Sequence, residues 1–499
     1  MSERVIALLE NRIADFLDQQ LIVKQLNSPL GYLMLTSIIV ATTGITVFKG
    51  ASTVWWLIGL IVTVPMLVRS FFDLEFGVLL TITISFFVIY LRKFIDFPFG
   101  FLLDTLLVIL LLGLLYQAIQ ERKFALSKHP ISVMIYIWIG YNALQVLNPA
   151  APSMTGWAYS IRSLALWLII YFVALRVVNW QFVKRFIIVV SALMLFSALY
   201  GLKQEYIGFS QREMDWLMED PLRWRLYFTW ARLRVFSFFG DPTSFGIAMV
   251  YWGIVCLILA TGPFAIWKRI LLAAIAMPML LVMAYTGSRT PMILLVIGAA
   301  FYFLMNVNWT TVAIGAVFAM AIGVFALKPN GNPVIFRMQS AFRPQEDRSM
   351  LLRLENQNSI QPYIQSHPIG AGLASIGVWG KRFNGGSWLA NFAPDSAYVR
   401  VAVECGWIGL IIFMMLFGVI LWTCIRYFFR VKDPTIKVVY LAFANMLFLI
   451  TVANYPQEAS YMIPTTLVFN VILAIVVRLK DFDSAYQLEE SQPFASKQA

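Results

Sequence analysis

The chain has 499 residues, of which 60% are hydrophobic and only 13% are charged. A water-soluble domain of this length needs far more charged residues to cover its surface, so the composition excludes a soluble globular protein. The three cysteines and two histidines show no metal-ligand spacing, and we therefore expect no metal site, no disulfide framework and no cofactor.

Long apolar blocks recur along the chain, with the roughly 17–25 residues that an α-helix needs to cross about 30 Å of hydrocarbon. They lack the two-residue alternation of a membrane β-barrel, so we predict an all-α, polytopic integral membrane protein with about 14 transmembrane helices. The predicted spans are residues 30–48, 52–69, 74–91, 99–117, 131–147, 159–176, 183–203, 243–261, 268–286, 291–306, 309–327, 406–425, 437–453 and 461–478.

Lysine and arginine concentrate in alternate loops when the amino terminus is placed in the cytoplasm. Arg122 and Lys123 lie in one such loop, and Arg426 and Arg430 lie in another. This asymmetry follows the positive-inside rule, so we predict a multi-pass protein of the bacterial inner (plasma) membrane with both termini in the cytoplasm. The net charge of +12 is then a topology signal, and we expect no nucleic-acid partner.

The predicted spans leave two long loops on the periplasmic side of the membrane. The segments are a cytoplasmic amphipathic stretch (1–29), N-terminal transmembrane helices (30–203), a first long loop (204–242), central transmembrane helices (243–327), a second long loop (328–395), C-terminal transmembrane helices (396–480) and a polar cytoplasmic tail (481–499). Unstructured loops of such length are uncommon unless they carry a function. Functional residues are therefore expected in these two loops.

The first long loop ends in Arg232 and Arg234, which run into the segment Phe236–Pro242 with Asp241 near its end. Arginine can bind phosphate in a bidentate manner, while neighbouring aromatic rings can face lipid or sugar. An interfacial amphipathic helix whose arginines contact membrane lipids would have the same composition. The pattern is equally consistent with both interpretations.

Arg289 lies in a turn, Tyr285–Pro291, between two predicted spans and on the side where the positive-inside rule disfavours arginine. An arginine held at that depth usually has a partner or a task. A functional role is therefore favoured over an arginine that merely snorkels to the interface.

The second long loop carries Arg348 and Arg353 on a stretch whose polar and apolar residues alternate at helical spacing. Arg353 is therefore expected to project from a helix near the mouth of the bundle. His367 precedes a proline and a glycine-rich turn, which favours a structural loop residue over a catalyst. Asp395, at the end of the loop, either belongs to a helix N-cap or supplies a carboxylate to the same cavity.

Three further charges, Asp104, Arg162 and Glu404, are placed inside spans. Charges in lipid are expensive, so these residues should face the interior of the bundle. Arg162 lies near the outer end of its span and could join the loop arginines. Asp104 is either the partner of Arg162 or a proton-relay carboxylate of a transporter.

These residues amount to several arginines, few carboxylates and no nucleotide-binding loop on the extracytoplasmic side. Nucleotide sugars and ATP are not in ordinary supply there, so a reaction needs an activated donor that a lipid brings, such as a sugar on a lipid diphosphate. Arginines suit that donor because they stay charged and can neutralise the diphosphate as it leaves.

The order of several short segments resembles the O-antigen ligase and Wzy-type polymerase family. The segments are Arg234–Gly246, Thr286–Arg289, Ser349–Arg353, Ser366–Gly372, Asp395–Tyr398 and Glu404–Gly409, within about 232–413. Each is weak alone, but their order, spacing and topology are together fairly specific.

The resemblance implies a metal-independent, inverting glycosyltransferase with a GT-C-like fold, whose donor is a glycan on undecaprenyl diphosphate and whose acceptor is a sugar hydroxyl. By position, Arg289 and Arg353 would hold the diphosphate, with Arg234 as a helper. The ligases commonly have a His-Asn pair where this chain has Asp395-Ser396, so Asp395 would replace the histidine as the base. This departure favours a polymerase of O-antigen or exopolysaccharide repeats over a ligase, and such polymerases often have a chain-length regulator as partner.

Two other functions stay open. A transporter or flippase of lipid-linked oligosaccharides would have related halves and broken helices at the midplane, and no repeat symmetry is apparent. A non-catalytic scaffold in a polysaccharide export complex is also compatible with the sequence.

Overall fold

A computed structural model describes residues 63–95, 99–122, 127–229, 232–328, 333–342 and 348–484. The chain forms two compact units, residues 1–69 and 70–499, and only residues 63–69 of the first are described. The predicted amphipathic stretch 1–29, the span 30–48 and most of the span 52–69 therefore lie outside the described residues. The same holds for the tail after residue 484.

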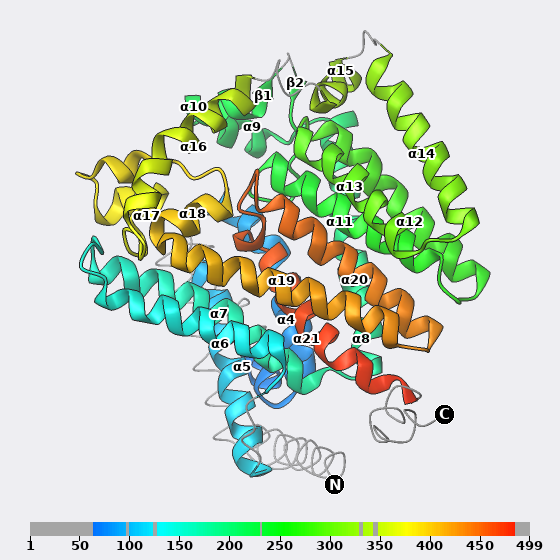
Figure 1. Ribbon diagram of the computed structural model, residues 1–499, viewed down its shortest axis with the longest axis horizontal. Helices are drawn as coiled ribbons and strands as arrows, with labels where there is room; N and C mark the ends of the chain where they lie inside the picture. The colour runs from blue at the N-terminus through cyan, green and yellow to red at the C-terminus, as the bar shows by residue number, and fades with distance from the viewer. Residues whose placement is uncertain are drawn as a thin grey trace, which may run out of the picture. The chain divides into compact units, whose positions relative to one another are not determined.

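The described part of the second unit is almost entirely helical (Figure 1). Its first helices are α4 (Leu74–Arg92), α5 (Gly100–Gln120), α6 (Pro130–Leu144), α7 (Met154–Val177), α8 (Trp180–Tyr206), α9 (Gln211–Met218), α10 (Pro221–Tyr227), α11 (Pro242–Ala260), α12 (Ile266–Tyr285) and α13 (Arg289–Met305). They are followed by α14 (Trp309–Leu327), α15 (Pro333–Gln339), α16 (Arg348–Ser366), α17 (Gly377–Phe383), α18 (Ala397–Glu404), α19 (Gly406–Arg430), α20 (Pro434–Ala453) and α21 (Thr465–Leu479).

Ten of the described helices are long and apolar enough to cross a membrane. They are α4, α5, α6 with the short turn that follows it, α7, α8, α11, α12, α14, α19 and α20. The sequence predicts about 14 spans. Two of the other four lie wholly or mostly outside the described residues, and the last two correspond to α13 and α21, which have only 17 and 15 residues.

The core of the bundle is formed by helices that are apolar on all sides. Helix α11 packs against α12, α13 and α20, and α21 packs against α7. Every residue of α21 except Arg478 is buried, as expected for a helix without a polar face. Small residues let the helices approach closely, and a Cβ at Gly298 would come within 2.6 Å of Ile254.

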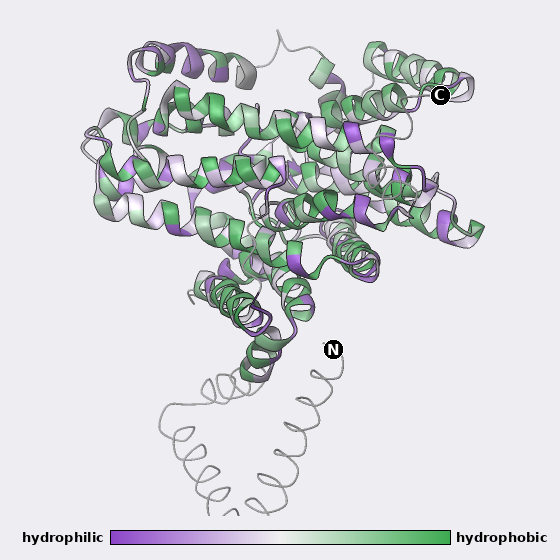
Figure 2. Cartoon of the chain, turned by 60° about the horizontal axis from the view of Figure 1, so that its bottom comes forward, coloured by the Kyte–Doolittle hydropathy of each residue, from purple (hydrophilic) through white to green (hydrophobic). Residues whose placement is uncertain are grey.

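The two long loops of the prediction are largely ordered. The first contains α9, α10 and a small antiparallel hairpin of β1 (Phe228–Thr229) and β2 (Arg232–Leu233), in which Phe228 pairs with Leu233. The second contains α15, α16 and α17, and α18 follows it directly. Figure 2 shows the strongly hydrophilic α16 beside helices that are mainly hydrophobic, so α16 is a helix of the loop and does not span a membrane.

The predicted position of Glu404 was wrong. Glu404 ends the short helix α18 and does not lie inside a span, because Gly406, with a φ of +71°, separates α18 from α19. After α21, buried Asp483 accepts hydrogen bonds from the backbone N–H of Lys432 (2.7 Å) and Asp433 (3.2 Å), so it contacts the connection between α19 and α20.

Candidate active site

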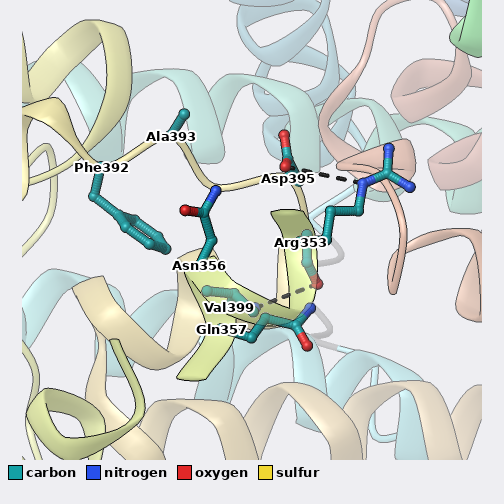
Figure 3. Close-up of a pocket in the computed structure, with 8 residues that line it drawn as sticks. Arg353, Asn356, Gln357, Phe392, Ala393, Asp395 and Val399 are labelled. Atoms are coloured by element: carbon teal, nitrogen blue, oxygen red, sulfur yellow. Dashed lines mark hydrogen bonds and ion pairs between the residues drawn. The ribbon is translucent and has the colours of Figure 1, made fainter. Parts of the chain in front are cut away.

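Arg353 and Asp395 face each other across a pocket in the second long loop (Figure 3). The Nε of Arg353 lies 3.9 Å from Oδ2 of Asp395. The pocket is lined by Arg353, Asn356, Gln357, Phe392, Ala393, Asp395, Ser396 and Val399. The sequence placed Arg353 and Asp395 in one site, and the structure brings them together.

Helix α16 holds Arg353 because its other face is packed into the loop. Ile360 is buried, and together with Ala371, Ile376, Leu389 and Val403 it forms a small hydrophobic core, separate from that of the bundle. Helix α16 also contacts α18 and α19. A polar helix therefore keeps a fixed position through a few apolar side chains, and Arg353 projects from it toward the pocket.

The sequence left open whether the segment at Asp395 caps a helix or supplies a carboxylate to the pocket, and in the structure two adjacent residues do one each. Ser396 is the N-cap of α18 and accepts a hydrogen bond from the N–H of Val399 at 3.4 Å. Asp395 precedes the cap, and its side chain is 50% exposed. The N-cap prediction is thus confirmed for Ser396, while the carboxylate of Asp395 faces the pocket.

The segment around Asp395 is fastened to the connection between α20 and α21. The Oγ of Ser396 and the N–H of Ala397 both donate to the carbonyl of Asn454, at 3.1 and 3.0 Å. The hydroxyl of the next residue, Tyr398, donates to the carbonyl of Thr451 at 2.7 Å. These contacts hold the loop against the transmembrane helices.

Arg289 is the first residue of α13 and follows the turn that ends α12. Burial lowers the pKa of the Arg289 guanidinium, and the positive charge of Arg353 lowers it further. The two guanidinium groups therefore repel each other. Arginines gathered in this way against their own repulsion suit a ligand that carries more than one negative charge.

Arg234 directs its donors to acceptors of the protein. It donates through Nε to the carbonyl of Thr286 at 2.9 Å, and also to the hydroxyl of Ser288, the hydroxyl of Thr243 and the carbonyl of Leu226. It thereby ties the end of the first long loop to the turn before Arg289. Its predicted contact with a diphosphate stays a prediction.

Asp241 acts as a helix cap in the structure. It is the N-cap of α11 and accepts hydrogen bonds from the N–H groups of Thr243 at 2.8 Å and Ser244 at 3.0 Å. This arrangement satisfies two N–H donors that would otherwise lack a partner at the start of the helix.

Arg162 and Asp104 form an ion pair between α7 and α5, with Nη1 and Oδ2 3.5 Å apart. Asp104 is therefore the partner of Arg162, one of the two alternatives that the sequence left open. Neither residue is among the described residues that line the Arg353–Asp395 pocket. Their contribution to the site stays a prediction.

His367 and Arg348 complete the predicted residues. The Nδ1 of His367 lies 2.9 Å from the carbonyl of Tyr363, and the two rings stack with centroids 3.9 Å apart. These contacts agree with a structural loop residue. Arg348 begins α16, and its side chain lies outside what the structure describes.

Sequence reasoning missed Arg400 and Glu458. The Nε of Arg400, on α18, lies 3.0 Å from Oε1 of Glu458, in the connection between α20 and α21. One signal was available: α19 and α20 are consecutive predicted spans, so the chain before α19 and the chain after α20 lie at the same end of the bundle. A glutamate in so short a connection could therefore have been assigned to the neighbourhood of Asp395.

The chemistry of the site is that of arginines and carboxylates. In the part of the chain that the structure describes, no three His, Cys, Asp or Glu side chains gather as a metal-binding group. Two arginines can stabilise an anionic leaving group, and a carboxylate beside them can accept a proton.

Comparison with known families identifies a domain in the same region. Residues 272–414 match the family model described as O-antigen ligase, Wzy_C. The match begins within α12, ends within α19 and contains Arg289, Arg353 and Asp395, whereas the segment Arg234–Gly246 lies outside it. A comparison with curated proteins finds no match. The family resemblance is thereby confirmed: the chain is a multi-pass membrane protein that carries a domain of the O-antigen ligase (Wzy_C) family, whose members transfer glycosyl groups in polysaccharide biosynthesis.

Proposed function

We propose that this protein polymerises oligosaccharide repeats carried on undecaprenyl diphosphate, at the periplasmic face of the bacterial inner membrane. The observation that carries the proposal is the convergence of Arg289, Arg353 and Asp395, from three separate segments, within one family domain. Arg353 pairs with Asp395, and Arg289 interacts electrostatically with Arg353. Two arginines and a carboxylate match the two needs of the reaction, a stabilised leaving group and a proton acceptor.

In the proposed reaction, Arg289 and Arg353 bind the diphosphate of the donor. The acceptor hydroxyl attacks the anomeric carbon from the side opposite the diphosphate, and its proton passes to Asp395. The new C–O bond forms as the bond to the diphosphate breaks, so the electron pair leaves on the diphosphate and the anomeric centre inverts. Arg353 pairs with Asp395 at 3.9 Å in the structure, and the incoming diphosphate competes with Asp395 for this guanidinium.

The proposed orientation follows from the helix order. The turn between α12 and α13 and the second long loop contribute to one site, so α13 and α14 together lead away from it and back. Although α13 has only 17 residues, it then extends about 25 Å, at 1.5 Å per residue. The positive-inside pattern assigns this end of the bundle to the periplasm and both termini to the cytoplasm.

The acceptor is proposed to approach along α16. The amides of Asn356 and Gln357 line the pocket beside Arg353 and can bind sugar hydroxyls. Two turns further along, the rings of Tyr363 and Trp388 lie 5.7 Å apart, and Trp388 is 58% exposed. Exposed aromatic rings can pack against the C–H faces of a sugar, and a chain-length regulator would act on the growing glycan in this region.

A ligase that transfers the finished glycan to lipid A core is the second candidate, because the matching family model is described as O-antigen ligase. The active site would be the same, and only the acceptor would differ. A polymerase uses another lipid-linked repeat, whereas a ligase uses the core of the lipopolysaccharide.

The test is to delete the protein and complement the strain with wild type, Arg289→Ala, Arg353→Ala or the control Arg185→Ala, and to separate the surface glycans on a gel. Arg185 pairs with Glu75 at 2.6 Å, away from the pocket. Single repeats on the core without long polymer indicate a polymerase. Loss of all attachment, with long chains on undecaprenyl diphosphate, indicates a ligase.

Unchanged glycans in both arginine variants, at wild-type protein levels, would contradict the proposed transferase. Transport is tested separately with purified protein, by measuring transfer between lipid-linked donors in detergent. A transporter or flippase gives no product there, because it forms no glycosidic bond.

A further inference from the structure

Arg400 and Glu458 form a partly buried ion pair near the segment that carries Asp395. Their side chains are 20% and 18% exposed, and the Nε and Oε1 atoms lie 3.0 Å apart. The N–H of Arg400 donates to the carbonyl of Ser396 at 2.9 Å, so Arg400 lies one helical turn after Asp395 and Ser396. Glu458 directly precedes the short turn Ala459–Tyr461, which leads toward α21.

The geometry of this pair is poor for stabilising the fold. Among the described residues, Arg400 Nε, Glu458 Oε1, Ser460 Oγ and Asn454 Nδ2 are all buried and have no hydrogen-bond partner. The arginine and glutamate are therefore in electrostatic contact without a well-directed hydrogen bond. A buried ion pair that lacks such bonds contributes little or nothing to stability, because desolvation offsets the attraction.

The ion pair of Arg400 and Glu458 interacts electrostatically with Asp395 in the pocket. Burial raises the pKa of Glu458, Arg400 lowers it, and the carboxylate of Asp395 raises it again. Burial also raises the pKa of Glu404 to about 7, and Arg400 opposes that shift too. Arg400 thus offsets two buried carboxyl groups, one of which interacts with Asp395.

We propose that Arg400 and Glu458 are positioning residues for glycosyl transfer, which set the place of Asp395 opposite Arg353. The segment 395–400 is attached to the α20–α21 connection at two points. Ser396 and Ala397 bind the carbonyl of Asn454 at one end, and Arg400 binds Glu458 at the other. Between these two points Tyr398 also contacts α20, through the carbonyl of Thr451. Without the ion pair, α18 is held less firmly at the Arg400 end, and Asp395 moves relative to the acceptor hydroxyl. This inference rests on the proposed function.

The experiment measures transfer by the purified full-length protein, per folded molecule, for wild type, Glu458→Gln, Arg400→Gln and the control Arg185→Gln. We expect kcat to fall about 10- to 100-fold in both variants of the ion pair, since small displacements of reacting groups have effects of this size. The KM for the lipid-linked donor should stay within about twofold of wild type, because Arg289 and Arg353 are unchanged. Glu458→Asp, which keeps the charge, should recover part of the lost kcat.

A second arm introduces Glu458→Gln into Asp395→Asn. Because the pair acts through Asp395, this combination should lose no further activity. Wild-type kcat per folded molecule in both single variants would overturn the proposal. It would also be overturned if Glu458→Gln lowered kcat by the same factor in Asp395→Asn as in wild type. Full activity of Asp395→Asn alone would instead refute the proposed base. If Asp395→Asn has no measurable transfer, the kcat and KM of the single variants decide. If Glu458→Gln does not fold, Glu458→Asp takes its place, and the expected result is a kcat below that of the Arg185→Gln control but with a smaller loss than the about 10- to 100-fold expected for Glu458→Gln.

Discussion

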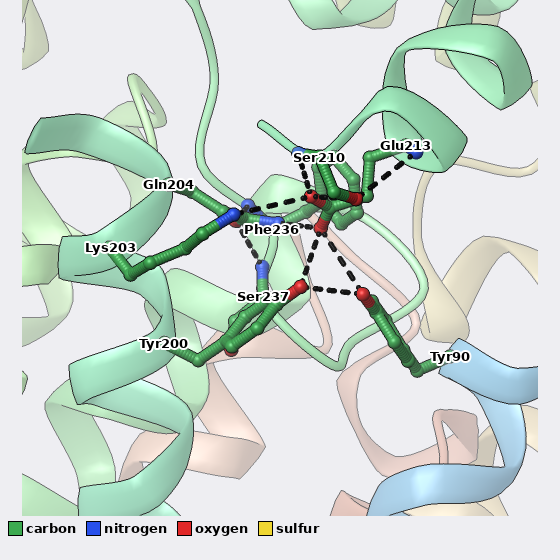
Figure 4. A network of polar contacts seen from close by, with 8 residues as sticks. All are labelled: Tyr90, Tyr200, Lys203, Gln204, Ser210, Glu213, Phe236 and Ser237. Atoms are coloured by element: carbon green, nitrogen blue, oxygen red, sulfur yellow. Dashed lines mark hydrogen bonds and ion pairs between the residues drawn. The ribbon is translucent and has the colours of Figure 1, made fainter. Parts of the chain in front are cut away.

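The amide of Gln204 joins two parts of the chain through its opposite ends (Figure 4). Its Nε2 donates to Oε1 of Glu213 at 2.6 Å, while its Oε1 accepts the N–H groups of Phe236 and Ser237. Glu213 is fully buried and also accepts a hydrogen bond from Tyr200 at 3.2 Å. Helix α9 and the segment before α11 are thereby fastened to the end of α8.

Glu213→Ala should lower the stability of the protein. The substitution leaves the buried amide of Gln204 and the partly buried hydroxyls of Tyr200 and Ser210 without their acceptor, and an unsatisfied buried donor costs about 1–3 kcal/mol. Thermal unfolding in detergent measures the change. Asp215→Ala on the exposed face of α9 is the matched control, and equal melting temperatures for the two variants would contradict the expectation.

Lys93 should make stability depend on pH. Desolvation lowers its pKa to about 7, although Asp241 and Glu213 act in the opposite direction. The unfolded chain keeps the ordinary pKa of 10.5 and so binds more protons than the folded protein between about pH 7 and 10.5. Stability therefore rises with pH in this window, by at most about 1.4 kcal/mol per unit.

The measurement compares the unfolding of wild type and Lys93→Met from pH 6 to 9. The difference between the two proteins should shift in favour of wild type as the pH rises above 7. Parallel curves over the whole range would show that Lys93 keeps its ordinary protonation.

Gly406→Ala should disturb the pocket from a distance. A Cβ at Gly406 would lie 2.0 Å from the carbonyl oxygen of Pro368, and the φ of +71° is unfavourable for alanine. The start of α19 must then move, and α18 with it. We expect a large loss of stability, of several kcal/mol or misfolding.

Gly418→Ala on the same helix is the control for Gly406→Ala. A Cβ at Gly418 meets no atom within 4 Å, so this variant should be as stable as wild type or up to about 1 kcal/mol more stable. Membrane levels and melting temperatures distinguish the two. Equal behaviour would mean that the contact with Pro368 relaxes without effect.

Arg234→Gln should weaken donor binding through its effect on Arg289. Arg234 holds the turn Thr286–Ser288 that precedes Arg289, so its loss lets Arg289 move. We expect a several-fold higher KM for the lipid-linked donor and a loss of about 1–3 kcal/mol in stability, since buried donors and acceptors lose a charged partner. An unchanged KM would leave Arg234 with a role in folding alone.

Much of the bundle can be predicted from the sequence because a membrane span must be a long apolar helix, and such helices are visible as long apolar stretches in the sequence. The same holds for the approximate places of Arg289, Arg353 and Asp395, which come from the order of motifs. The prediction of Glu404 inside a span was wrong, because one glycine ends α18 and no periodicity marks that break. The predicted span at 461–478 starts too early for α21, since residues 461–464 form part of the connection that meets Asp395.

Contacts between distant segments were the part that sequence could not supply. Arg234 is an arginine among aromatics in the chain, but its partners lie more than forty residues away at Thr286 and Ser288. The pairing of Arg400 with Glu458 depends likewise on how α18 and the α20–α21 connection pack. The two residues of such a pair stand at no fixed distance from each other in the sequence, so no sequence pattern predicts their contact.

The burial of α21 has a consequence for biosynthesis. This helix follows all the other described helices in the chain, yet it lies at the centre of the bundle and packs against α7. During synthesis, α7 emerges about 300 residues earlier, which at ~5–20 residues per second leaves its buried face without its partner for ~15–60 s. The bundle can therefore pack completely only after α21 has been synthesised. Until then the other helices assemble in the membrane without their central helix.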